Sequence, residues 1–152
     1  AGLDDTLLTT NRKIKANLKN WLGQYKMIND TVDILDAKVL NLGIDYKVIG
    51  ERDVNKYDLI QDINVALNEK FAPMPEIGQS FFITDVYNVI NGVNGVVDTE
   101  DVEIFVQTGG VYSEFSLDLD RYISPDGRFV KMPDDVIWEI KFIGNDIKGT
   151  VV

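Results

Sequence analysis

Carboxylates are the side chains with which this sequence could do chemistry. Its 152 residues include 25 Asp and Glu but neither Cys nor His. A thiol nucleophile, a disulfide, a zinc finger and an imidazole base are therefore excluded. Carboxylate pairs can hydrolyse glycosides, and clustered carboxylates can hold hard cations such as Ca²⁺. Those two kinds of site, together with lysine, tyrosine or serine chemistry, are what the composition leaves open.

The carboxylates spaced most like a metal site are Asp118, Asp120 and Asp126. A calcium-binding loop of the EF-hand type needs oxygen ligands at positions 1, 3 and 5, Gly at 6 and Glu at 12. Asp118 and Asp120 fit the first two positions, but Tyr122 and Ile123 occupy the next two. A phosphate loop, a dinucleotide fingerprint and a nucleophile elbow are also missing. The sequence thus predicts no metal, no cofactor and no enzymatic activity.

The formal net charge is −10, and it is unevenly placed along the chain. Residues 1–75 carry 10 basic and 11 acidic side chains, whereas residues 76–152 carry 5 and 14. A surface this acidic repels a phosphate backbone, so we expect no nucleic-acid partner. No apolar run approaches 18 residues, and we therefore expect no membrane span.

The first predicted element is a helix over about residues 11–22, with Thr9 or Thr10 as its N-cap. Its apolar stripe comprises Ile14, Leu18, Trp21, Leu22 and Tyr25. A second, basic stripe comprises the candidate partner-binding residues Arg12, Lys15, Lys19 and Lys26. No acidic residue lies between Thr6 and Asn29. The basic stripe is either a solvated polar face or a docking stripe for an acidic partner, including the acidic half of another copy.

The middle of the chain predicts a strand–helix–helix–strand unit, which is an α+β arrangement. A short strand over 32–34 and a strand over 39–49 precede a helix over 56–71 with Asn55 as its N-cap. A short run over 80–83, a helix over 85–91 capped by Thr84 and a strand over 101–107 follow. Phe81 and Phe82 are adjacent, so one must face away from the core and could cover a partner; both are candidate partner-binding residues. Periodicity also predicts buried aromatic residues at Trp21, Tyr25, Tyr46 and Trp138.

The last third of the chain alternates apolar and polar residues between turns. Residues 115–119 alternate, Pro125-Asp126-Gly127 is a turn, and residues 136–142 alternate before a second turn at 144–146. The pattern predicts two β-hairpins. The expected organisation has three parts. An extended lead-in covers residues 1–8, and an α+β core covers residues 9–107, in which the capped helix precedes the strand–helix–helix–strand unit. A β-hairpin-rich C-terminal extension covers residues 108–152.

The order of these elements, with the residues at their junctions, also suggests a family. The matching segments are Thr10 to Lys15, Tyr25, Asp30 to Ile34, Asn41 to Val48, Asn55 to Phe71, Ile77 to Ile90, and Gly95-Val96. They cover about residues 9–107. In this order and spacing the chain resembles the baseplate J-like wedge proteins of T-even contractile-tailed bacteriophages, in their carboxy-terminal part.

The resemblance implies a structural role in the virion, with assembly in the host cytoplasm. Proteins of this family self-associate, typically as dimers, and link neighbouring wedges into the baseplate ring around the tail hub. The implied partners are a second copy and other wedge proteins, and no catalytic residue, metal or cofactor carries over. Family members are far longer than 152 residues, so the resemblance implies a carboxy-terminal fragment, with which Ala1 in place of Met agrees.

Two other functions stay open at the level of sequence. A carbohydrate- or receptor-binding module of a tail protein would show an exposed aromatic platform on the β-rich tail. A carboxylate-dependent glycan hydrolase would show two carboxylates facing each other in a cleft, one with a raised pKa.

Overall fold

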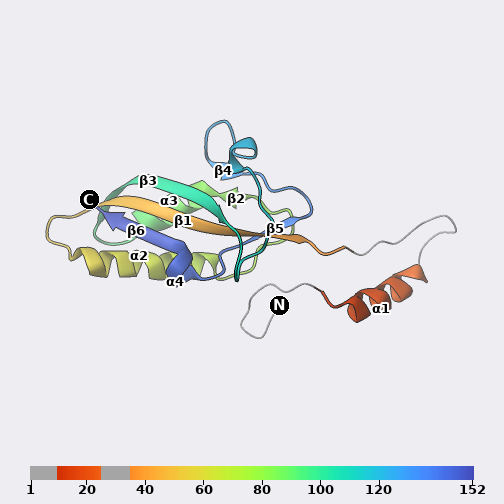
Figure 1. Cartoon of the computed structure of the whole chain (residues 1–152). Helices are drawn as coiled ribbons and strands as arrows, with labels where there is room; N and C mark the ends of the chain where they lie inside the picture. The colour runs from red at the N-terminus through yellow and green to blue at the C-terminus, as the bar shows by residue number, and fades with distance from the viewer. Residues whose placement is uncertain (1–9, 25–34) are drawn as a thin grey trace. The chain divides into compact units, whose positions relative to one another are not determined.

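The computed structural model describes residues 10–24 and 35–152 (Figure 1). The chain divides into residues 1–37, which contain helix α1 (Arg12–Gly23), and a compact body over residues 38–152. The fold class is α+β, as predicted. The predicted lead-in over 1–8 and strand over 32–34, together with Tyr25 and Lys26, lie outside the described residues. The division falls at residue 37 rather than at residue 107, because strands that follow residue 107 pair with the central strand of the body's sheet.

Strand β1 (Lys38–Gly50) is the centre of that sheet, and the predicted strand over 39–49 is confirmed. Its buried face consists of alternate apolar residues: Leu40, Leu42, Ile44, Tyr46 and Val48. Strand β3 (Val96–Gln107) runs antiparallel along one edge, with Asn41 opposite Gln107 and Ile44 opposite Ile104. β3 begins earlier than the predicted residue 101, because its first residues continue the ladder towards Gly50.

Strands β5 (Val136–Glu139) and β6 (Ile147–Val151) share the other edge of β1, and both are parallel to it. β5 pairs with residues 38–41 and β6 with residues 44–48, so the two lie end to end with helix α4 (Ile143–Asp146) between them. The predicted hairpin between 136–142 and 147–152 is therefore wrong. Because both strands complete the central sheet, residues 108–152 belong to the body and are not an extension.

Helices α2 (Lys56–Phe71) and α3 (Ile83–Asn91) pack against each other and against the buried face of the sheet (Figure 1). Asn55 caps α2 as predicted: its Oδ1 accepts a hydrogen bond of 2.9 Å from the Tyr57 backbone N–H. Leu59, Ile63 and Leu67 are the buried residues of α2. The Thr84 cap is wrong, because α3 already begins at Ile83 and Thr84 lies within its first turn.

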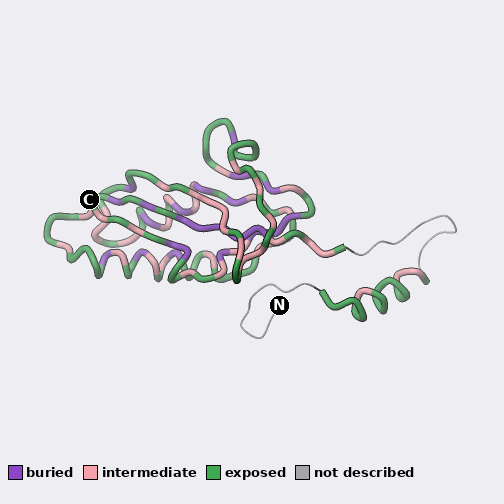
Figure 2. Tube along the Cα trace, in the orientation of Figure 1, coloured by how far each residue is buried: buried purple, intermediate pink, exposed green. Residues whose placement is uncertain are grey.

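A two-stranded ribbon of β2 (Phe81–Phe82) and β4 (Phe129–Val130) flanks the main sheet. The turn at Pro125-Asp126-Gly127 is confirmed, since Gly127 has a φ of +69° and Ile123 bridges Val130. The alternating residues 115–119 form no strand; the short 3-10 helix η1 (Leu119–Arg121) begins at their end. Figure 2 shows that buried residues follow the body's sheet and helices, whereas α1 has none.

Candidate partner-binding surfaces

Helix α1 carries three of the four basic residues that the sequence analysis proposes for partner binding. Its N-cap is Asn11 rather than Thr9 or Thr10: the Asn11 Oδ1 accepts a 2.8 Å hydrogen bond from the Lys13 backbone N–H. The helix brings Arg12, Lys15 and Lys19 along one side, because neighbouring residues are turned by about 100°. The fourth residue, Lys26, lies outside the described residues.

Lys15 forms an ion pair within its own chain. Its Nζ lies 2.6 Å from the Asp36 Oδ2, and the Thr10 backbone N–H donates to the Asp36 Oδ1 at 3.1 Å. The Lys15 ammonium, followed by the Thr10 backbone, holds the pKa of Asp36 below its usual range. Asp36 therefore ties the first turn of α1 to the residues just before β1. Arg12 and Lys19 remain exposed.

The apolar stripe of α1 is not buried. Ile14, Leu18 and Trp21 are 59%, 43% and 55% exposed. The prediction that Trp21 is buried is wrong, whereas the same prediction is confirmed for Tyr46 and Trp138. The helix is thus amphipathic, with a basic stripe beside an exposed apolar stripe.

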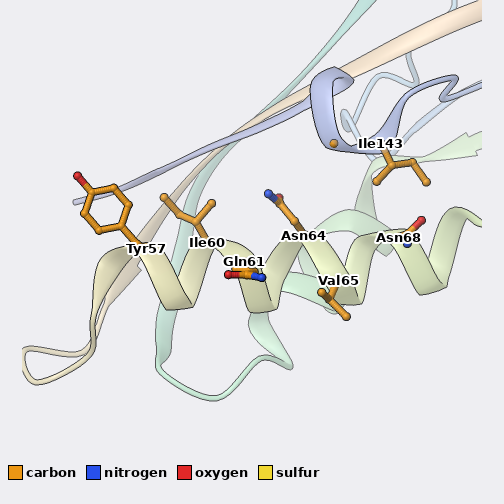
Figure 3. A pocket seen from close by; sticks show the side chains of 8 residues that line it. Tyr57, Ile60, Gln61, Asn64, Val65, Asn68 and Ile143 are labelled. Carbon is orange, nitrogen blue, oxygen red and sulfur yellow. The ribbon is translucent and has the colours of Figure 1, made fainter.

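A shallow groove of about 340 Å³ runs along α2 beside α4 (Figure 3). Its lining mixes apolar and amide side chains: Tyr57, Ile60, Gln61, Asn64, Val65 and Asn68 from α2, with Ile143 and Gly144 from α4. Tyr57 and Val65 are 84% and 52% exposed. The Asn64 Oδ1 accepts a 2.9 Å hydrogen bond from the Tyr46 hydroxyl, which fixes the groove floor to the sheet.

An acidic stripe flanks this groove on α2. It consists of Asp58, Asp62 and Glu69, all exposed. Each follows a groove residue by one position, after Tyr57, Gln61 and Asn68 respectively. Sequence reasoning missed the groove, although Tyr57 and Val65 lie off the buried stripe of the predicted helix and could have indicated it. The contribution of α4 comes from a distant part of the chain and had no local indication.

The two adjacent phenylalanines of β2 divide between core and surface, as strand alternation predicts. Phe81 is fully buried, with its ring 5.5 Å from that of Phe71 and 5.0 Å from that of Trp138. Phe81 is therefore a core residue, and its assignment to a partner surface is wrong. Phe82 is half exposed, and its ring lies 5.6 Å from that of Phe129. Phe82 alone of the pair can meet a partner.

The acidic turn that resembled a calcium loop is occupied by contacts within the chain. Asp118 pairs with Arg121 at 3.2 Å and Asp126 with Arg128 at 3.3 Å. The Ser124 hydroxyl donates to Asp126 at 2.6 Å and lowers the pKa of that carboxyl. Among residues 10–24 and 35–152, no three carboxylates gather closely enough to hold a metal ion.

A buried carboxylate, Asp146, anchors the last third of the chain to the sheet. Its oxygens accept hydrogen bonds from the Gln107 side chain at 2.9 Å, the Tyr112 hydroxyl at 2.5 Å and the Phe142 backbone N–H at 2.9 Å. The Asp146 hydrogen bond is also the main cause that raises the pKa of Tyr112. The rings of Tyr112 and Phe142 meet edge to face, at 77°, rather than as a flat platform. Asp146 and its hydrogen-bond partners therefore stabilise the fold of the body.

No protein-family model matches the sequence, and no curated protein does. The described part of the chain contains no helix that is both long and apolar enough to cross a membrane. The α1 surface and the α2–α4 groove are the candidate partner-binding surfaces of the described residues.

Proposed function

We propose that this chain is an assembly module of a contractile-tail baseplate wedge, which self-associates and links neighbouring wedges around the tail hub. The observation that carries the self-association in this proposal is α1, a basic amphipathic helix whose apolar stripe is exposed. A helix of 12 residues is marginal in water by itself, so its stripe needs a surface to cover it. An assembly protein supplies such a surface from its neighbours.

The composition and the order of elements support the same proposal. The chain resembles baseplate J-like wedge proteins over about residues 9–107, and a structural role asks for no catalytic constellation. The charge distribution also favours association: residues 38–152 carry 10 basic and 20 acidic side chains, whereas α1 carries four basic and none acidic. Opposite charges on two parts of one chain steer copies together and fix their relative orientation.

The proposal requires the gene for this chain to lie in a phage genome, and electron microscopy of that phage tests it. Gold-labelled antibodies against the body are expected at the end of the tail that carries the baseplate. A premature stop codon before residue 38 is expected to give particles without complete baseplates. Label elsewhere on the particle, or normal baseplates in the truncated mutant, would overturn the assignment.

A further inference from the structure

The α1 helix and the α2–α4 groove complement each other: one is a helix and the other a groove, and the charged residues beside them have opposite signs. The α1 stripe is apolar with basic residues beside it, and the α2–α4 groove is apolar and amide-lined with acidic residues beside it. Two α1 helices facing each other would bring like charges together, and so would two grooves. The complementary combination is α1 against the groove.

The order of residues on the two helices sets the direction of such a contact. On α1, Lys15 and Lys19 each follow an apolar stripe residue by one position, and on α2, Asp58 and Asp62 each follow a groove residue by one position. Both charged stripes are therefore turned about 100° in the same sense from the contact face. In two helices that face each other, this places the charged stripes on the same side only when the helices run antiparallel.

The spacing also matches in the antiparallel direction. Lys15 and Lys19 are four residues apart, as are Asp58 and Asp62, so the register that puts Lys15 beside Asp62 puts Lys19 opposite Asp58. Because Lys15 already pairs with Asp36 of its own chain, Lys19 and Asp58 are the charge pair that the contact brings together. The apolar stripe from Ile14 to Leu22 is about 12 Å long and the groove from Tyr57 to Asn68 about 16 Å, at about 1.5 Å per residue. The helix therefore fits within the length of the groove.

We infer that α1 of one copy docks antiparallel into the α2–α4 groove of a second copy, with the basic stripe of α1 against the acidic stripe of α2. The inference rests on the proposed self-association and names the surfaces that carry it. When each copy gives its helix to the other, the contact is made twice and the dimer closes with twofold symmetry. Two such contacts are needed, because stable interfaces bury about 1,200–2,000 Å².

Charge-reversal variants of the full chain test this contact by sedimentation equilibrium. Lys19→Glu and Asp58→Lys alone are each expected to raise the dimer dissociation constant about tenfold or more, since each places like charges together twice per dimer. An equimolar mixture of the two variants is expected to dimerise about as well as the wild type. In the mixed dimer one contact is of the original kind and the other has both charges exchanged.

Lys13→Glu is the matched control, because it makes the same charge change on the opposite side of α1. It is expected to leave the dissociation constant within about threefold of the wild type. Circular dichroism of each variant checks that the body is folded, and the mixture provides a second check, since each variant must act as a competent partner. Raising the salt concentration is expected to weaken the wild-type dimer.

Three results would overturn the inference. A wild-type chain that stays monomeric at high concentration removes the dimer, whether or not α1 folds back on its own body; the baseplate assignment then depends on the microscopy above. A dimer that neither variant weakens has its interface elsewhere. Two variants that stay monomeric when mixed, although both are folded, show that Lys19 and Asp58 do not face each other.

Discussion

Helices α1 and α2 begin with the same kind of N-cap, but their apolar stripes lie in opposite environments. Each has an Asn N-cap whose side-chain oxygen accepts a hydrogen bond from the backbone N–H two residues later, and each carries an apolar stripe at helical spacing. α2 buries Leu59, Ile63 and Leu67 in the body, whereas no residue of α1 is buried. The comparison shows that periodicity identifies which residues share a face but not what covers that face. In α2 the cover is the chain's own sheet, and in α1 we assign it to a second copy.

The largest expected effect comes from one matched pair of substitutions, Leu42→Ala in β1 and Leu18→Ala in α1. Leu42 is fully buried, so its truncation is expected to lower the free energy of unfolding by about 3 kcal/mol. Leu18→Ala is expected to change it by less than about 0.5 kcal/mol, because the side chain is exposed in the single chain. Urea denaturation at low protein concentration measures both. Equal losses would mean that α1 contributes to the body's core.

The next effect concerns the carboxylate that ties residues 108–152 to the sheet. Asp146→Ala leaves the Tyr112 hydroxyl and the Gln107 amide without their acceptor and is expected to cost about 2–3 kcal/mol of unfolding free energy. Asp134→Ala, at an exposed position, serves as the control. If Asp146→Ala were as stable as Asp134→Ala, the last third would not be held by this network.

A close approach in β6 gives a similar but smaller effect. A Cβ at Gly149 would overlap the Tyr46 ring, which is buried and held by Asn64. Gly149→Ala is therefore expected to lower the free energy of unfolding by about 2 kcal/mol through overpacking. Gly144→Ala in α4, where a Cβ has open space, is expected to be nearly neutral. Thermal or urea unfolding that does not distinguish the two alanines would contradict this packing.

The smallest effect is the pH dependence of the contacts around Asp36. Lys15 and the Thr10 backbone lower the pKa of Asp36 in the folded chain, so its stabilising contribution is complete above the ordinary pKa of 3.8 and is lost as the pH falls through the lowered value. An NMR titration of the Asp36 carboxyl is expected to show a midpoint below 3.8 in the wild type. In Lys15→Gln the midpoint is expected to move back upward, and an unchanged midpoint would exclude the ion pair.

Much of the body could be predicted from local pattern. The alternating residues of β1, the Asn55 cap and apolar stripe of α2, and the turn at Gly127 all act through near neighbours in the chain. The parallel pairing of β5 and β6 could not be predicted in this way. Val136, Ile137 and Trp138 are buried in succession, and the turn-like residues 144–146 form α4 because Asp146 meets Gln107 and Tyr112.

The candidate surfaces divide along the same line. The basic stripe on α1 follows from helical spacing alone, so sequence reasoning found Arg12, Lys15 and Lys19. The burial of Phe81 depends on Phe71 and Trp138, and the groove depends on Ile143 of α4 lying beside α2. Such contacts between distant segments cannot be predicted from the local sequence pattern. The surfaces that rest on them could be recognised only in the folded chain.

Amide hydrogen exchange of the full chain at low and high protein concentration tests most directly whether α1 is covered by a second copy. Amides of β1 are expected to be protected at both concentrations, because the body has its own core. Amides of α1 are expected to exchange quickly in the dilute chain and slowly in the concentrated one, whereas those of α2 are protected at both concentrations by the packing of that helix in the body. Protection of α1 that does not change with concentration would contradict the account.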